Sequence, residues 1–159
     1  PEMLKAGVTV SLGCDGGPSN NCYDMIREMK LAALLHKVHS LDPLVLPAES
    51  VIEMATINGA KSIRLNNEIG SIVPGKKADI ILLDFKKPHL TPMHNPVSHL
   101  VYAANGSDVH TVIIDGEIVM ENKEVKTIDE RWVLEEAEKR GLAVAQRANI
   151  TIKPKWPLQ

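Results

Sequence analysis

The apolar pattern of the chain changes near Ile69, and this change constrains the fold more than any other feature. Before it, a short apolar run at Val8–Leu12 is followed by two segments with helical spacing, over residues 25–37 and 47–55. After it, short apolar segments alternate with turns. A strand followed by helices predicts an α/β arrangement for the first part, and short strands joined by turns predict a small sheet for the second.

The run at Val8–Leu12 has many β-branched residues and little alternation, which is typical of a strand buried on both faces in a parallel sheet. We expect Asn20 or Asn21 to cap the helix that follows it, and Pro47 to open the next helix. The residues before Gly7 have the pattern of a helix that ends at a glycine, so the chain is expected to be part of something longer.

The second part carries the signals of a small, partly antiparallel sheet. Strands are predicted at Ala78–Leu83 and Val109–Ile114. Asp115-Gly116 is a strong hairpin signal, and Ile118–Met120 is the expected return strand. Residues 86–96 contain three prolines and predict an extended loop, and a short helix is expected over residues 97–104.

The last part of the chain is predicted to be a helix and a tail. Thr127 and Glu130 match a capping box, which indicates that a helix of about twenty residues follows. The tail, residues 153–159, has two prolines and is expected to be extended.

Charge and cysteine content exclude several classes of protein. The net charge is -2 and the basic residues are scattered, so nucleic acid is not an expected partner. No apolar run approaches the ~20 residues that cross a bilayer, so no membrane association is expected. Cys14 and Cys22 form neither a disulfide framework nor a CxxC metal site, which favours a reducing, cytoplasmic location.

Asp15 is the main candidate for chemistry. It follows the predicted strand and precedes two glycines and Pro18. Spacing alone favours a turn aspartate that accepts backbone N–H groups. The alternative is a metal ligand or general base, because catalytic groups of α/β folds lie at the carboxyl ends of parallel strands. The residues by themselves leave both interpretations open.

The histidines are weaker candidates. His89, His94 and His99 recur every five residues, a spacing that fits neither a helical metal site nor a strand, so we expect them in a surface loop and away from any metal. His36 and His39 lie three apart on a helix without a third ligand nearby in sequence. We expect His36 to contact the core and His39 to face water.

Four motifs, in their order and spacing, carry a resemblance to a known family. They are AGVTVSLGCDGGPSNN with DMIREMKLAALLHK after it, ATINGAKSI, GSIVPGKKADIILLD and VIIDGEIV. Together they resemble the C-terminal part of the amidohydrolase superfamily, in the branch of S-adenosylhomocysteine, 5′-methylthioadenosine and 5′-deoxyadenosine deaminases. The resemblance extends to about Ile128.

The resemblance implies an α/β fold, the C-terminal part of a (β/α)₈ barrel with part of a small β-sandwich. Residues 1–64 would hold the last barrel strand with its helices, residues 65–126 the sandwich portion, and residues 127–159 a C-terminal helix and tail. The family's other metal ligands and its acid-base glutamate have no counterpart here, so the chain by itself is expected to be inactive.

The resemblance also implies an enzyme that hydrolytically deaminates an adenine nucleoside with metal-activated water. Asp15 would bind one divalent metal ion, with zinc first and iron or manganese as alternatives, and would accept a proton from the water. Cys14 stands where the family more often has threonine and is interpreted as a tolerated small residue. Substrate-binding residues stay unassigned, and a homo-oligomer is expected. A chlorohydrolase, a guanine deaminase or a non-catalytic association module are the alternatives.

Overall fold

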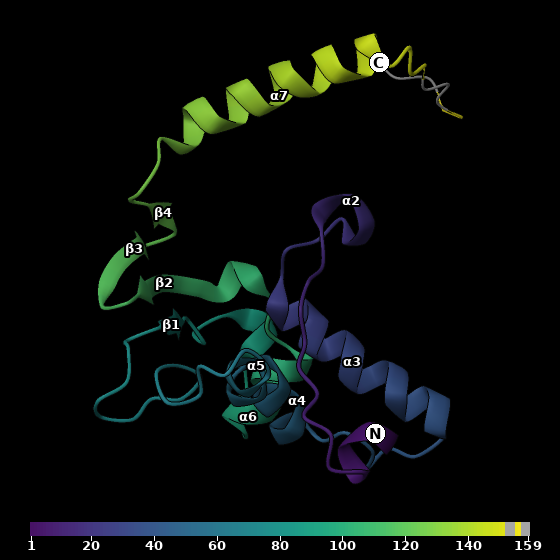
Figure 1. Ribbon diagram of the computed structural model, residues 1–159, viewed down its shortest axis with the longest axis vertical. Coiled ribbons are helices and arrows are strands. Elements are labelled where there is room, and N and C mark those ends of the chain that lie inside the picture. Colours follow the sequence, from purple (N-terminus) through teal and green to yellow (C-terminus); the bar gives the residue numbers. More distant parts are fainter. Residues whose placement is uncertain (152–154, 157–159) are drawn as a thin grey trace.

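The computed structural model describes residues 1–151 and 155–156 and consists of helices and one antiparallel sheet (Figure 1). The helices are α1 (Glu2–Lys5), α2 (Gly17–Asn20), α3 (Met25–Ser40), α4 (Ala48–Ala55), α5 (Ile57–Ser62), α6 (Pro96–Tyr102) and α7 (Glu130–Arg147), with short 3-10 helices η1 (Pro88–Leu90) and η2 (Gly106–Asp108). The strands are β1 (Ile80–Leu83), β2 (Val109–Ile114), β3 (Glu117–Glu121) and β4 (Glu124–Val125). Most of the predicted tail lies outside the described residues.

The core lies where α3, α4 and α6 meet. On α3 its members are spaced three and four residues apart, so they form one face of the helix. The buried apolar side chains of these helices and η1 are Ile26, Met29, Ala33, Ala48, Val51, Met54, Leu90 and Val101. The predicted helical segments therefore meet in one apolar cluster.

The beginning of α3 differs from the prediction. Asp24 caps it, with its Oδ1 accepting from the backbone N–H groups of Ile26 at 2.9 Å and Arg27 at 3.1 Å. Asn20 and Asn21 do not cap it, because Gly17-Pro18 opens the separate short helix α2, which ends at Asn20 and is followed by Asn21 with a φ of 58°. In contrast, α4 begins directly after Pro47, as predicted.

Residues 8–12 are extended but belong to no sheet in the described part of the chain, which corrects the predicted strand. Val10 and Leu12 contact the core, whereas Thr9 and Ser11 are exposed, so the segment is partly buried on one face and exposed on the other. The Leu12 N–H donates to the Met54 carbonyl of α4 at 3.1 Å. A strand needs a neighbouring strand for its N–H and C=O groups, and residues 1–151 place none beside it.

The sheet has the order β1-β2-β3-β4 and is antiparallel throughout. Ile113 of β2 pairs with Ile80 on one side and Ile118 on the other. The predicted hairpin at Asp115-Gly116 is confirmed: the φ angles are 51° and 85°, and two positive φ values are what a tight hairpin turn requires.

Helix α7 stands apart from the other helices (Figure 1). It begins at Glu130, capped by Asp129, whose Oδ1 accepts from the Trp132 N–H at 3.0 Å, so the predicted capping by Thr127 is wrong. None of its residues is buried. Among the described helices, none combines the length and apolar character needed to cross a membrane.

Candidate metal-binding loop

Asp15 lies in the loop between the extended residues 8–12 and α2, and it is exposed. Its φ is 56°, in the left-handed region that side chains other than Asn and Asp rarely adopt. The direction of the carboxylate therefore depends on an uncommon backbone conformation. The interactions around Asp15 are what maintain it.

The Asp15 carboxylate has one hydrogen-bonded and one available oxygen. Its Oδ2 accepts from the Ser19 hydroxyl at 3.0 Å, and that hydroxyl has the Gly16 carbonyl at 2.9 Å as an alternative acceptor. Within the described residues, Oδ1 of Asp15 has no hydrogen-bond partner. This oxygen can bind a cation.

The loop after Asp15 is held from two sides. The Gly17 N–H donates to the Tyr23 hydroxyl at 2.6 Å, and a Cβ at Gly17 would lie 2.6 Å from that same oxygen, so a larger residue here would displace the Tyr23 ring. The Asn20 side-chain amide donates to the Cys14 carbonyl at 2.7 Å and to Oε1 of Glu28 on α3 at 2.8 Å.

The donor chemistry of Asp15 fits a divalent metal, but Asp15 by itself does not make a metal centre. A carboxylate oxygen is a ligand for zinc, iron or manganese, and such sites take three or more protein ligands. The described residues contain no group of three or more His, Cys, Asp or Glu that could hold a metal. Asp15 can therefore contribute one ligand to a site whose other ligands come from elsewhere.

Several histidines have partners other than Asp15 in the described part of the chain. Nε2 of His89 lies 3.0 Å from Oδ2 of Asp108. His99 contradicts the surface-loop prediction, because it is half-buried on α6 with its ring nitrogens near the carbonyls of Asn95 and Pro92. His36 is half-buried, and His39 is exposed as predicted.

Asp108 is a buried carboxylate that the sequence prediction missed. It accepts from Lys87 Nζ at 2.7 Å, from His89 at 3.0 Å and from the Asn105 N–H at 2.9 Å. Burial raises its pKa, but these hydrogen bonds outweigh burial and lower the pKa to about 2. The spacing of Asn105 and Asp108, which form a capping box at η2, was the available signal.

Cys14 is half-buried beside Asp15. Burial raises the pKa of its thiol, with a further contribution from the negative charge of Glu28. Because the thiolate is the reactive form, this environment opposes a nucleophilic role. Cys14 serves instead through its carbonyl, the acceptor for Asn20.

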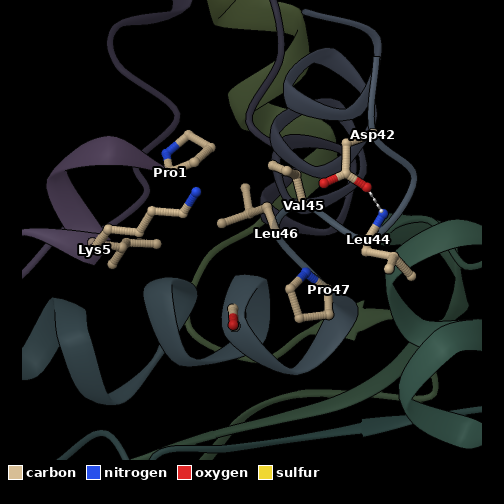
Figure 2. Close-up of a pocket in the computed structure, with 9 residues that line it drawn as sticks. Pro1, Lys5, Asp42, Leu44, Val45, Leu46 and Pro47 are labelled. Carbon is tan, nitrogen blue, oxygen red and sulfur yellow. Dashed lines mark hydrogen bonds between the residues drawn. The ribbon is translucent and has the colours of Figure 1, made fainter. Parts of the chain in front are cut away.

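A separate pocket of about 280 Å³ lies between α1 and residues 42–50 (Figure 2). Its lining is largely apolar, and its Asp42 carboxylate accepts from the Leu44 N–H at 2.8 Å. Leu4 and Lys5 of α1 line the pocket. Helix α1 lies at the opposite end of the extended residues 8–12 from α2 (Figure 1). The pocket is therefore not part of the Asp15 loop.

The chain belongs to the amidohydrolase family. Residues 1–119 match the family model described as "Amidohydrolase family", so the match includes Asp15, the core helices and most of the sheet. The expected family is thereby confirmed.

Curated relatives with high identity are named as nucleoside deaminases. The chain is 51% identical over 137 residues to a 5-methylthioadenosine/S-adenosylhomocysteine deaminase from Syntrophomonas wolfei, covering 86% of this chain and 32% of that protein. It is 52% identical over 148 residues to a 5'-deoxyadenosine deaminase from Methanosarcina mazei, covering 93% and 34%. The chain thus spans about a third of the length of these relatives.

Solved structures share the fold of the chain. A zinc-bound adenosine deaminase from Xanthomonas campestris aligns with a TM-score of 0.88 at 31% identity, covering 91% of this chain and 33% of that one. The atrazine chlorohydrolase TrzN from Arthrobacter aurescens, also with zinc, aligns with a TM-score of 0.77 at 26% identity, covering 87% and 31%.

Proposed function

We propose that this chain is the C-terminal portion of a metal-dependent aminohydrolase that deaminates an adenine nucleoside. The substrates proposed are S-adenosylhomocysteine, 5′-methylthioadenosine or 5′-deoxyadenosine. The observation that carries the proposal is the identity of 51–52% to deaminases named for these compounds, over 86–93% of the chain. The cofactor proposed is one divalent metal ion, with zinc preferred because the aligned adenosine deaminase structure has zinc bound.

Asp15 is proposed as a metal ligand and proton acceptor. When bound, such a metal lowers the pKa of a coordinated water towards ~7. Oδ1 of Asp15 is available to a cation, whereas Oδ2 accepts from Ser19 and is held in place by it. A carboxylate in this position takes a proton from a neighbouring water and orients that water for attack.

The proposed organisation assigns residues 1–64 to the last part of a (β/α)₈ barrel, residues 65–126 to part of a β-sandwich and residues 127–159 to a C-terminal helix and tail. It is supported by the extended segment at residues 8–12, which pairs with no strand in the described part of the chain, and by the sheet, where Leu82 and Ile118 are about half exposed. A parallel neighbouring strand would pair with the backbone of the extended segment, and a facing sheet would cover the exposed apolar side chains of the four-stranded sheet. A cytoplasmic location stays a prediction.

The proposal is tested with Asp15→Asn in the complete protein that carries these residues. The amide keeps the shape and one acceptor oxygen but loses charge and basicity. The turnover number with zinc bound should fall ~10²–10⁴-fold, the usual contribution of a general acid or base. The matched control is Asp42→Asn, a turn aspartate whose replacement should leave turnover unchanged. An Asp15→Asn variant with more than about a tenth of wild-type turnover would mean that Asp15 is a turn residue and not a catalytic one.

A chlorohydrolase is the second candidate, favoured by the alignment with TrzN. Assays of the complete protein with 5′-deoxyadenosine, 5′-methylthioadenosine and atrazine decide between the two. Release of ammonia from the nucleosides supports the deaminase, and release of chloride from atrazine supports the alternative.

A further inference from the structure

The side chains of Asn20 and Glu28 connect the Asp15 loop to α3. Asn20 has two amide hydrogens to donate. One is donated to the Cys14 carbonyl at 2.7 Å and the other to Oε1 of Glu28 at 2.8 Å. Both donors are thus used, and the Asn20 side chain has a defined orientation.

The Cys14 carbonyl belongs to the peptide unit that contains the nitrogen of Asp15. A hydrogen bond to this carbonyl restrains the plane of the peptide, and the φ of Asp15 is the rotation that follows it. Asp15 has a φ of 56°, a conformation with an energetic cost for a residue that has a Cβ. Such a conformation persists only where the surrounding structure holds it, and the Asn20 amide supplies that restraint.

Glu28 attaches Asn20 to α3. It lies in the first turn of α3, between the buried residues Ile26 and Met29. Asp24 caps this turn through Oδ1, and its Oδ2 accepts from the Gly106 N–H at 2.8 Å. The connection therefore runs from the core, through α3 and Glu28, to Asn20, Cys14 and Asp15.

We propose that Asn20 and Glu28 are positioning residues that hold Asp15 in its left-handed conformation and so aim its carboxylate. This inference rests on the proposed function, in which Asp15 binds the metal. Asn20 would touch neither metal nor substrate. It would act through the backbone of Cys14.

The experiment measures zinc affinity by chelator competition, together with turnover, in the complete protein. Asn20→Ala should weaken zinc binding and lower turnover by about 10–100-fold, the range for residues that orient a metal ligand. The thermal midpoint should stay within a few degrees of wild type. The matched control is Asn21→Asp, because the neighbouring Asn21 side chain is exposed and makes no hydrogen bond within the described residues.

The double variant Asp15→Asn with Asn20→Ala separates positioning from general destabilisation. If Asn20 acts through Asp15, its removal should have little further effect on zinc affinity once Asp15 is changed. Equal effects of Asn20→Ala in both backgrounds would overturn the inference. An unchanged zinc affinity in Asp15→Asn itself would overturn the proposed function and this inference together.

Variants of Glu28 provide a second test of the inference that leaves the sequence of the Asp15 loop unchanged. Glu28→Ala should lower zinc affinity less than Asn20→Ala does, because the bond to the Cys14 carbonyl remains. Glu28→Gln keeps an acceptor oxygen and should restore most of the affinity. If Asn20→Ala does not fold, these two variants decide: equal affinities for Glu28→Ala and wild type would count against the inference.

Discussion

The carboxylate of Asp24 accepts a hydrogen bond at 2.8 Å from the backbone N–H of Gly106, a residue 82 positions further along the chain. Its other oxygen caps the first turn of α3. The Asp24 side chain therefore joins α3 to the beginning of η2. Helix α3 is also the helix that holds the Asp15 loop through Glu28. The close approach also restricts Gly106, where a Cβ would lie 3.0 Å from Cγ of Asp24.

Replacement of Asp24 by alanine should destabilise the protein. It removes a helix cap and a long-range hydrogen bond, so we expect the free energy of unfolding to fall by roughly 1–3 kcal/mol. Urea unfolding of the complete protein measures it. Gly106→Ala should act in the same direction. The control Glu53→Ala changes an exposed residue of α4 and should stay within about 0.5 kcal/mol of wild type. Equal stability of Asp24→Ala and wild type would contradict the expectation.

The buried Asp108 should make stability depend on pH in the acid range. Its pKa is lowered from 3.8 to about 2 in the folded protein, so the ionised form contributes stability above pH 3.8. That contribution is lost as the pH falls through the folded pKa, between about pH 4 and pH 2.

The variant Asp108→Asn measures this contribution. At pH 7 its free energy of unfolding should be roughly 3 kcal/mol lower than that of the wild type. Breaking a buried ion pair typically costs about 3–5 kcal/mol, and the amide retains one acceptor. The difference from wild type should shrink as the pH approaches 2. Asp115→Asn is the control, since its ion pair with Lys77 is exposed. A difference that stays constant from pH 7 to pH 2.5 would argue against the ionised Asp108.

The 159 residues expressed alone should associate. Besides its core face, α3 has a second apolar face on the opposite side, formed by Leu31, Leu34, Leu35 and Val38. The Leu35 and Val38 side chains are 58% and 71% exposed. Contiguous exposed apolar surface of this kind promotes association.

Light scattering after size-exclusion chromatography measures the association. Leu35→Gln with Val38→Gln should raise the fraction of monomer. Ile72→Gln changes a residue that is 80% exposed but lies outside α3, and it should have a smaller effect. A monodisperse monomer of the unaltered chain with a cooperative melt would refute this expectation.

Features that depend on neighbouring residues could be predicted from the sequence. Gly116 adopts a positive φ angle without steric cost and Asp115 at a lower cost than most residues with a Cβ, so the hairpin follows from two residues. Pro47 cannot continue a preceding helix but can open a new one, and α4 begins after it. The buried stripe of α3 follows from the 3.6-residue period. Asp15, at the end of the extended segment, was identified as a candidate site for the same local reasons.

Features that depend on distant partners were decided by the tertiary structure. Asp24, Asn20 and Asn21 are all good helix caps, and the course of the chain through α2 selected Asp24. Asp108 is polar and would be expected at the surface, but Lys87 and His89 make its burial favourable. Residues 8–12 have strand propensity, yet strand hydrogen bonds need a neighbour that propensity does not supply. Backbone dihedral preferences depend on a few neighbouring residues and can be predicted from short stretches of sequence. Burial and strand pairing depend on which distant groups the fold brings together.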